Sequence, residues 1–406
     1  MTLEPNQKIA TTLRPTDLRS VRDALLDTAG TVSIAGAGTA ADWAGPLEPV
    51  ETALDTTGLT GVITHNPGDM TVSVLAGTPL RALTEELAPH GQHVSYDAAR
   101  VADGATVGGL IATADAGPAA LVFGSLRDLV IGVTIVLSDG TVARSGGHVI
   151  KNVAGYDLAK LLHGSYGTLG VLVEVVLRLH PVAKRTATLV VDCSLADAAE
   201  HAARVLGGQH EPAALEWVST GAGDGQLLLR VEGTETALSA RLQRLREVLG
   251  ADAQEAAEPS GERPARLGAV DQSAARAADP WAHHATLVRG TPDVAVLRIG
   301  ALPSALPGLL ANLPATTVTA GLGTGVATVS LAPDAVADAH AVVHAAGGTS
   351  VLRARPAGSD AQAWGPPPSA IAVLQAVKAE FDPRGRFGPG RFAPWPLTRN
   401  EEKGSR

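Results

Sequence analysis

The chain has 406 residues, 45% of them hydrophobic, and a formal net charge of −9. This length predicts two or three domains with ample core. The acidic balance, without a basic run, argues against nucleic acid or an anionic membrane surface as the main partner. The single cysteine, Cys193, excludes an intramolecular disulfide and any multi-cysteine metal or iron–sulfur site built by this chain alone.

Targeting signals are also missing from the sequence. The N-terminus has no basic stretch followed by an apolar run, and nowhere do about 18 apolar residues follow one another. We therefore expect neither a signal peptide nor a membrane span, and we expect a cytoplasmic protein.

The first predicted elements are a helix over residues 16–28 and a strand over residues 31–35, which runs into Gly36-Ala37-Gly38-Thr39. A strand followed by G-x-G-x-x-A suggests a Rossmann fold. We disfavour that fold because the residues from Trp43 onward crowd the turn where a long helix should begin. The chain also begins with a helix, not with the first strand of that fold.

The same four residues have two other interpretations. A turn with exposed N–H groups forms a concave anion site that suits a pyrophosphate. A plain structural turn is the alternative.

Short strands are predicted next over residues 61–65 and 70–76, around an Asn-Pro-Gly-Asp turn. A helix follows to about residue 87, with Pro79 at its first position, and a strand over residues 92–96. Thr106, Val107, Gly108 and Gly109 then begin another helix. Small residues there let N–H groups face a negative charge; tight helix–sheet packing is the alternative.

A hairpin is predicted around Asp139-Gly140, because an alternating apolar strand over residues 130–137 precedes it. Further on, a short helix begins near Tyr156 and ends at Gly164. Gly167 and Gly170 bracket a tight turn, and a strand starts at Val171. These glycines allow the backbone to approach something flat or anionic closely.

After residue 181 the pattern changes to two strand–helix–strand units. Together they imply an antiparallel sheet with helices on one face, a ferredoxin-like arrangement. The predicted strands are 186–192, 213–219, 226–231, 294–299, 317–320, 326–331 and 351–355. The predicted helices are 195–206, 234–249, 304–313 and 333–346, and a further helix covers residues 370–380.

Three stretches carry a resemblance to a known family: VIKNVAGYDLAKLLHGSYGTLGV at residues 149–171, ATVGGLIATADAGPAALVFGSLRDLVIGVTIVLSDGTV at residues 105–142, and FDPRGRFGPGRF at residues 381–392. They resemble the flavin-binding domain of the vanillyl-alcohol oxidase and p-cresol methylhydroxylase superfamily. Within it they look most like the FAD-binding subunits of bacterial glycolate oxidase.

The resemblance implies an α+β protein with a p-cresol-methylhydroxylase-type FAD-binding domain over residues 1–182, in two subdomains at about 1–58 and 59–182. A ferredoxin-like cap domain over residues 183–369 follows. Residues 370–396 return to the FAD domain, and residues 397–406 form a flexible tail.

The resemblance also implies one FAD between the two halves of the first domain. Some relatives attach the flavin through histidine or cysteine, but no histidine occurs at residues 36–39 or 105–117, so we expect non-covalent binding. Arg127 or Lys151 could contact the phosphates or tune the flavin; a surface ion pair is the alternative for each. The expected cofactor-binding residues are Gly36, Ala37, Gly38, Thr39, Thr106, Val107, Gly108, Gly109, Arg127, Asn152, Gly155, Tyr156, Asp157, Gly167, Leu169, Gly170 and Val171.

The sequence assigns no catalytic base. Relatives that oxidise D-2-hydroxy acids carry an H-x-G-D-G-N-x-H metal motif in the cap, and this chain has none, so we expect no metal. Adjacent histidines at His283-His284 are a poor ligand spacing, and His163 beside the glycine turn has no visible partner. Tyr156 and Arg391 are weak candidates for contact with a substrate.

Three functions follow from the resemblance. The first is the smaller flavin subunit of a glycolate or D-2-hydroxy-acid oxidase (dehydrogenase) complex, which relays electrons beside a larger FAD subunit and an iron–sulfur subunit. Such a complex could lie at the inner face of the membrane. The second is a self-sufficient FAD-dependent alcohol or hydroxy-acid oxidoreductase. The third is a non-catalytic assembly subunit with a degenerate flavin site, which Ala35 and Ala37 favour because relatives often have arginine and glycine there.

Overall fold

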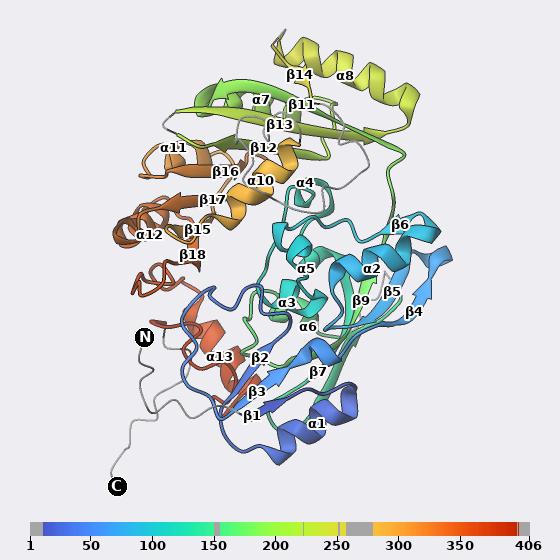
Figure 1. The fold of residues 1–406 in the computed structure, drawn as a ribbon, viewed down its shortest axis with the longest axis vertical. Coiled ribbons are helices and arrows are strands. Elements are labelled where there is room, and N and C mark those ends of the chain that lie inside the picture. Colours follow the sequence, from blue (N-terminus) through green and yellow to red (C-terminus); the bar gives the residue numbers. More distant parts are fainter. Residues whose placement is uncertain are drawn as a thin grey trace.

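The computed structural model describes residues 11–149, 155–221, 223–250, 252–256, 279–395 and 397. Within these ranges the strands form sheets of three, two, five and eight strands. The eight-stranded sheet lies above the others in Figure 1, and the three- and five-stranded sheets lie together beneath it. None of the described helices has the length and apolar character needed to cross a bilayer.

The three-stranded sheet is parallel, in the order β1 (Thr11–Leu13), β3 (Thr52–Asp55), β2 (Val32–Ala35). Helix α1 (Leu18–Asp27) connects its first two strands in sequence, and the Asp17 side chain accepts the N–H of Ser20 at 2.7 Å as its N-cap. The expectation that the chain begins with a helix is wrong, because β1 precedes α1. Strand β1 contains one large apolar residue, Leu13, so it shows no apolar period in the sequence.

The five-stranded sheet is antiparallel, in the order β4 (Val62–Asn66), β5 (Thr71–Leu75), β9 (Val171–Arg178), β7 (Val130–Val136), β8 (Val142–Gly146). Its central strand β9 is buried on both faces. One face packs in a cluster with helices α2 (Leu80–Leu87) and α3 (Val107–Ala112), and the other packs with α1 and the three-stranded sheet. The remaining elements of this region are α4 (Ala120–Phe123), α5 (Leu126–Leu129), α6 (Leu158–Leu162), and the paired strands β6 (Gln92–His93) and β10 (His180–Pro181).

The eight-stranded sheet is antiparallel throughout, in the order β14-β11-β13-β12-β16-β17-β15-β18. Its first half is β11 (Arg185–Ser194), α7 (Leu195–Gly207), β12 (Ala214–Ser219), β13 (Asp224–Gly233), α8 (Glu235–Leu249) and β14 (Gln254–Glu255). Its second half is β15 (Ala295–Gly300), α11 (Leu306–Leu310), β16 (Thr317–Gly321), β17 (Val326–Leu331), α12 (Val336–Ala345) and β18 (Thr349–Ala354). The two halves meet where β12 pairs with β16.

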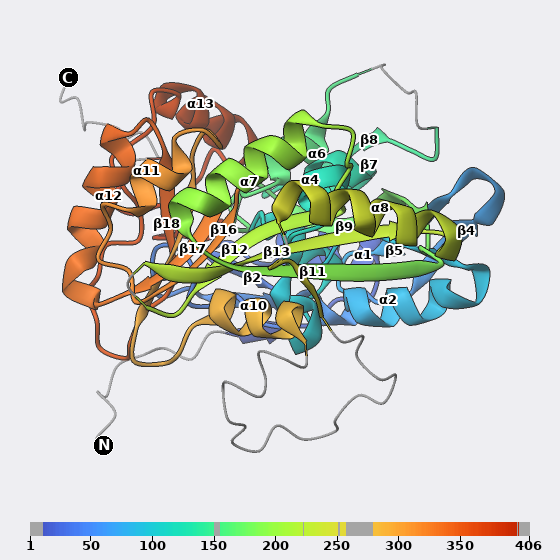
Figure 2. The same cartoon turned by 90° about the horizontal axis from the view of Figure 1, so that it is seen from above.

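Helices cover both faces of this sheet. Side chains from α7, α8, α11 and α12 share one apolar cluster with the strands, and Figure 2 shows α7 and α8 lying across the strands. Helix α10 (Pro280–Arg289) packs on the opposite face, where Leu287 contacts the cluster of Val218 and Leu228. The prediction of helices on one face is therefore wrong. Asp279 followed by Pro280 is a helix-start signal that the sequence analysis did not use.

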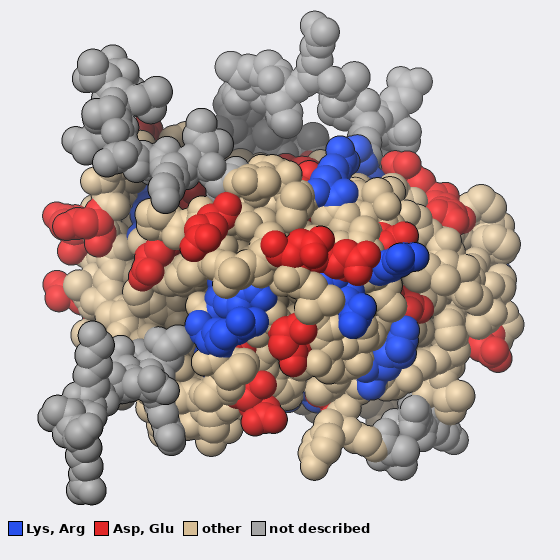
Figure 3. Space-filling model, turned by 90° about the horizontal axis from the view of Figure 1, so that it is seen from below, with Lys and Arg blue, Asp and Glu red and all other residues tan. Residues whose placement is uncertain are grey.

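The C-terminal helix α13 (Ile371–Phe381) leads back to the first sheets. Phe387 is buried in the cluster of α1 and β9 and pairs with Val32 in an isolated bridge. On the face seen from below, acidic and basic side chains are interspersed (Figure 3).

A buried ion pair fixes the segment from α13 to Phe387 against the first sheets. Lys378 Nζ lies 2.6 Å from Asp382 Oδ2 and also donates to the carbonyls of Thr168 and Phe387, at 2.8 and 3.0 Å. Both side chains are almost fully buried, and burial lowers the pKa of Lys378. The ammonium thus fastens the turn before β9 to the C-terminal segment.

Replacing this lysine should destabilise the protein strongly. Lys378→Met leaves the Asp382 carboxylate buried without its cation, which costs about 3–5 kcal/mol, so the midpoint of thermal unfolding should fall by several degrees. The matched control is Lys160→Met, which breaks an exposed pair with Asp157 and should cost about 1 kcal/mol or less. Circular dichroism measures both midpoints. Equal midpoints for the two variants would contradict the role assigned to Lys378.

Candidate functional site

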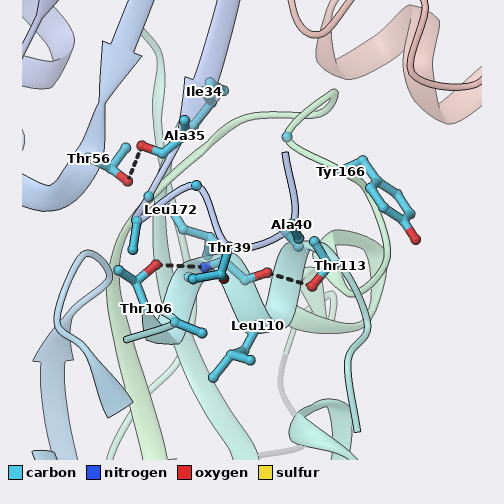
Figure 4. Close-up of a pocket in the computed structure, with 18 of the residues that line it drawn as sticks. Ile34, Ala35, Thr39, Ala40, Thr56, Thr106, Leu110, Thr113, Tyr166 and Leu172 are labelled. Carbon is cyan, nitrogen blue, oxygen red and sulfur yellow. Dashed lines mark hydrogen bonds between the residues drawn. The ribbon is translucent and has the colours of Figure 1, made fainter. Parts of the chain in front are cut away.

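A cavity lies between the three-stranded and five-stranded sheets. The space within its walls is about 970 Å³, part of it open to solvent. Figure 4 shows the segments that line it: the end of β2 with the turn after it, the start of α3, and the turn before β9.

The turn after β2 forms one wall. A Cβ on Gly36 would lie 2.3 Å from Thr106 Oγ1, and Gly38 has a φ of +74°, so both positions need glycine. The N–H groups of Ala37, Gly38 and Thr39 make no hydrogen bond to another residue that the structure describes. Unpaired N–H groups around such a turn make a concave site for an anion.

The start of α3 forms the facing wall. Thr106 is its N-cap and accepts the Gly109 N–H at 3.2 Å. The N–H of Val107 donates to Thr78 O at 2.9 Å, and that of Gly108 donates to Ala76 O at 2.7 Å. These three N–H groups are engaged within the protein, so tight helix–sheet packing describes this segment better than anion binding.

Arg100 is a cavity residue that the sequence analysis missed. It lies in a short 3-10 helix over Ala99–Asp103. Its Nε donates to Thr39 O at 2.7 Å, which fixes the turn of residues 36–39, called the anion turn below. Nη1 is buried and has no hydrogen-bond partner among the residues that the structure describes. Burial lowers the pKa of Arg100 to about 10, so the side chain stays charged at neutral pH.

Trp43 stacks between two arginines. Its ring lies 3.7 Å from the Arg100 guanidinium carbon and 3.9 Å from that of Arg353. Arg353 extends from β18 and pairs with the cavity residue Asp115 at 2.7 Å. Two guanidiniums and one carboxylate leave a net positive charge beside the cavity, which suits a phosphate or a reduced, anionic flavin.

Nine of the seventeen predicted cofactor-binding residues line this cavity. They are Gly36, Ala37, Gly38, Thr39, Thr106, Gly108, Gly109, Gly167 and Gly170.

Seven others are not among the residues that line the cavity. Val107, Leu169 and Val171 are buried in the apolar clusters, and Arg127 is exposed. Gly155, Tyr156 and Asp157 are exposed at the start of α6, where Asp157 caps the helix and pairs with Lys160 at 2.9 Å. Asn152 lies outside the described residues, as does Lys151. Contacts of all these residues with FAD stay predictions.

The substrate candidates and histidines lie in different surroundings. Arg391 lines the cavity and donates to Ala41 O at 2.8 Å, whereas the Tyr156 side chain is 89% exposed. Burial lowers the pKa of His163 to about 4, so it is neutral at pH 7. His284 faces Glu216 at 3.4 Å on the inner side of α10. Among the residues described, no group of three or more potential metal ligands gathers.

Residues 10–146 match the family described as FAD binding domain. This part of the chain is similar to known FAD-binding domains. This confirms the superfamily recognised from the sequence, the FAD cofactor, and a p-cresol-methylhydroxylase-type fold of mixed α and β content.

Relatives extend the comparison. Glycolate oxidase subunit GlcE of Escherichia coli is 34% identical over 192 residues, which are 47% of this chain and 52% of that protein. D-lactate dehydrogenase of Archaeoglobus fulgidus is 36% identical over 143 residues, 35% of this chain and 32% of that protein. The chain thus spans about half the length of the first and a third of the second.

A solved structure of alkyldihydroxyacetonephosphate synthase has a similar fold. It superposes with a TM-score of 0.66 at 14% identity and covers 93% of this chain and 76% of that chain. At this identity the likeness shows the fold alone.

The cavity of the FAD-binding domain fits its cofactor. Unpaired N–H groups and the buried Arg100 Nη1 supply donors for a pyrophosphate. Apolar side chains such as Ile34, Leu110 and Leu172 supply a wall for ring systems. When bound, FAD supplies an acceptor for the electrons of an oxidised substrate.

Removing Arg100 should weaken FAD binding. Arg100→Met loses a charged hydrogen bond to the anion turn and the free guanidinium N–H, so the Kd for FAD should rise about tenfold or more. Quenching of flavin fluorescence during titration of FAD-free protein measures this change. Arg81→Met, at an exposed pair on α2, is the control and should leave the Kd unchanged. The same Kd for both variants would remove Arg100 from the site.

Proposed function

We propose that the chain is a flavin subunit of a glycolate or D-2-hydroxy-acid oxidase (dehydrogenase) complex that relays electrons from hydroxy-acid oxidation. The observation that carries the proposal is the 34% identity to a glycolate oxidase subunit over 192 residues. It is supported by the cavity, most of whose lining residues lie in the part of the chain that matches an FAD binding domain. The missing H-x-G-D-G-N-x-H motif supports a relay, because the chain then depends on a partner for the chemistry on the hydroxy acid.

FAD would bind non-covalently, with its pyrophosphate on the N–H groups of Ala37, Gly38 and Thr39. Arg100 would hold the turn and face the phosphates. The isoalloxazine ring would point toward Tyr166, at the end of the cavity nearest the eight-stranded sheet. The buried pair of Arg353 and Asp115 would set the charge beside the ring.

The chain's other regions would serve this role from outside the cavity. Residues 1–182 would be the FAD-binding domain, with subdomains at about 1–58 and 59–182, and residues 183–369 the cap. The strand orders β14-β11-β13-β12 and β16-β17-β15-β18 support a cap of two ferredoxin-like units. Residues 370–396 would complete the FAD domain, followed by the tail. A larger FAD subunit and an iron–sulfur subunit would be the partners, in the cytoplasm or at the inner face of the membrane.

A self-sufficient oxidoreductase is the second candidate. It is favoured by a further cavity next to Tyr166, whose wall includes Arg298. In that case the chain would oxidise an alcohol or hydroxy acid by itself.

Anaerobic addition of glycolate or D-lactate to the FAD-loaded chain distinguishes the two functions. For a relay, the flavin absorption should stay oxidised with the chain alone and bleach when a larger flavin subunit is added. Bleaching by the chain alone would establish the second candidate. Flavin that stays oxidised even with the partner present would contradict both.

A further inference from the structure

A second cavity of about 1150 Å³, part of it open to solvent, adjoins the first. The two share Thr113 and Tyr166 as wall residues. The rest of its wall comes from β18, the turn after α12 and the segment from Trp364 to Ser369. It therefore lies between the eight-stranded sheet and the end of the FAD cavity.

Arg298 supplies the cation of this cavity. It lies on β15 and lines the space together with Ser350 of the neighbouring strand. Its guanidinium makes no hydrogen bond or ion pair with any residue in the described parts of the chain. Asp115, a nearby carboxylate, is already paired with Arg353. Burial lowers the pKa of Arg298 to about 10, so an unpaired positive charge is present at neutral pH.

Aromatic rings form the facing wall. Trp364 packs against Trp395 with the ring centroids 4.7 Å apart and tilted by 39°, and it meets Tyr166 edge-on at 5.5 Å. Both indole N–H groups donate to backbone oxygens, that of Trp364 to Arg391 O at 2.9 Å and that of Trp395 to Gly365 O at 2.8 Å. The two tryptophans thus present only their apolar surfaces to the cavity.

Tyr166 adds a hydroxyl between the two cavities. Figure 4 shows that hydroxyl pointing away from Thr39 and the anion turn. It has no hydrogen-bond partner among the described residues, and burial raises the pKa of Tyr166, so it remains a proton donor at neutral pH. Its φ of +51° is strained for a residue with a side chain, which indicates that the surroundings hold it in place.

We propose that this second cavity binds a small organic carboxylate, with Arg298 as its anchor and Tyr166 as a donor to a neighbouring oxygen. A guanidinium binds a carboxylate through two parallel hydrogen bonds, and an aromatic wall accommodates the carbon skeleton. The inference rests on the proposed function only in placing this ligand beside the FAD cavity.

The unpaired charge gives a signature that a structural arginine would not give. Arg298 is half-buried, and a partly desolvated cation that has no partner among the described residues adds nothing to the stability of the folded state. Arg298→Met should therefore leave the midpoint of thermal unfolding unchanged or raise it, while carboxylate binding is lost. A structural arginine would show the opposite, with a fall in the midpoint.

The test is calorimetric titration of the FAD-loaded chain with oxalate, a carboxylate that the flavin does not oxidise. Wild-type protein should bind it, and Arg298→Met should weaken binding about tenfold or more, since charged hydrogen bonds are lost. Arg298→Lys should keep part of the affinity. Arg244→Met removes an exposed arginine of α8 and should change nothing.

Three results would overturn the proposal: no binding of oxalate to wild-type protein, equal affinity of wild type and Arg298→Met, or a large fall in the thermal midpoint of Arg298→Met. The proposed electron relay fails separately. If oxalate binds through Arg298 while flavin stays oxidised with every partner and substrate, the relay is wrong and the carboxylate site stands.

Discussion

The stack of Arg100, Trp43 and Arg353 with Asp115 is the interaction on which the rest of the site depends. Its members come from four segments: the turn after β2, the loop before α3, the loop after α3, and β18 of the eight-stranded sheet. Charges buried this deeply are stable only when they are paired or hydrogen-bonded. These contacts hold the four segments together, with the anion turn facing the cavity.

A second buried charge holds the other wall. Lys378 donates to the carbonyl of Thr168, which lies between the cavity residues Gly167 and Gly170. The C-terminal helix thereby fixes a turn more than 200 residues earlier in the chain. Both walls thus depend on side chains from the C-terminal half, Arg353 and Lys378.

Glycine turns depend on local sequence, and this explains why parts of the site could be predicted. Gly36 and Gly38 follow a strand, and Gly167 and Gly170 precede one, so their turns could be located without knowing the fold. The alternating strands and amphipathic helices of the eight-stranded sheet could be located for the same reason. The single cysteine, Cys193, is half-buried and packs against the core, and burial raises the pKa of its thiol to about 11.

Long-range partners could not be predicted. Arg100 and Arg353 are far apart in sequence and no motif or spacing connects them to Trp43, so only the fold brings them together. Arg298 is one polar residue in an otherwise apolar strand, and its unpaired state depends on what the neighbouring strands carry. Strands β1 and β3 were missed because each contains one large apolar residue, which gives no periodic pattern. Helix α10 was missed although Asp279 and Pro280 mark its start.

The most direct test of the central claim is a crystal structure of the chain loaded with FAD. We predict that the pyrophosphate accepts hydrogen bonds from the N–H groups of Ala37, Gly38 and Thr39, with Arg100 beside it and the flavin ring toward Tyr166. A pyrophosphate bound elsewhere, or a covalent bond between flavin and protein, would contradict the account.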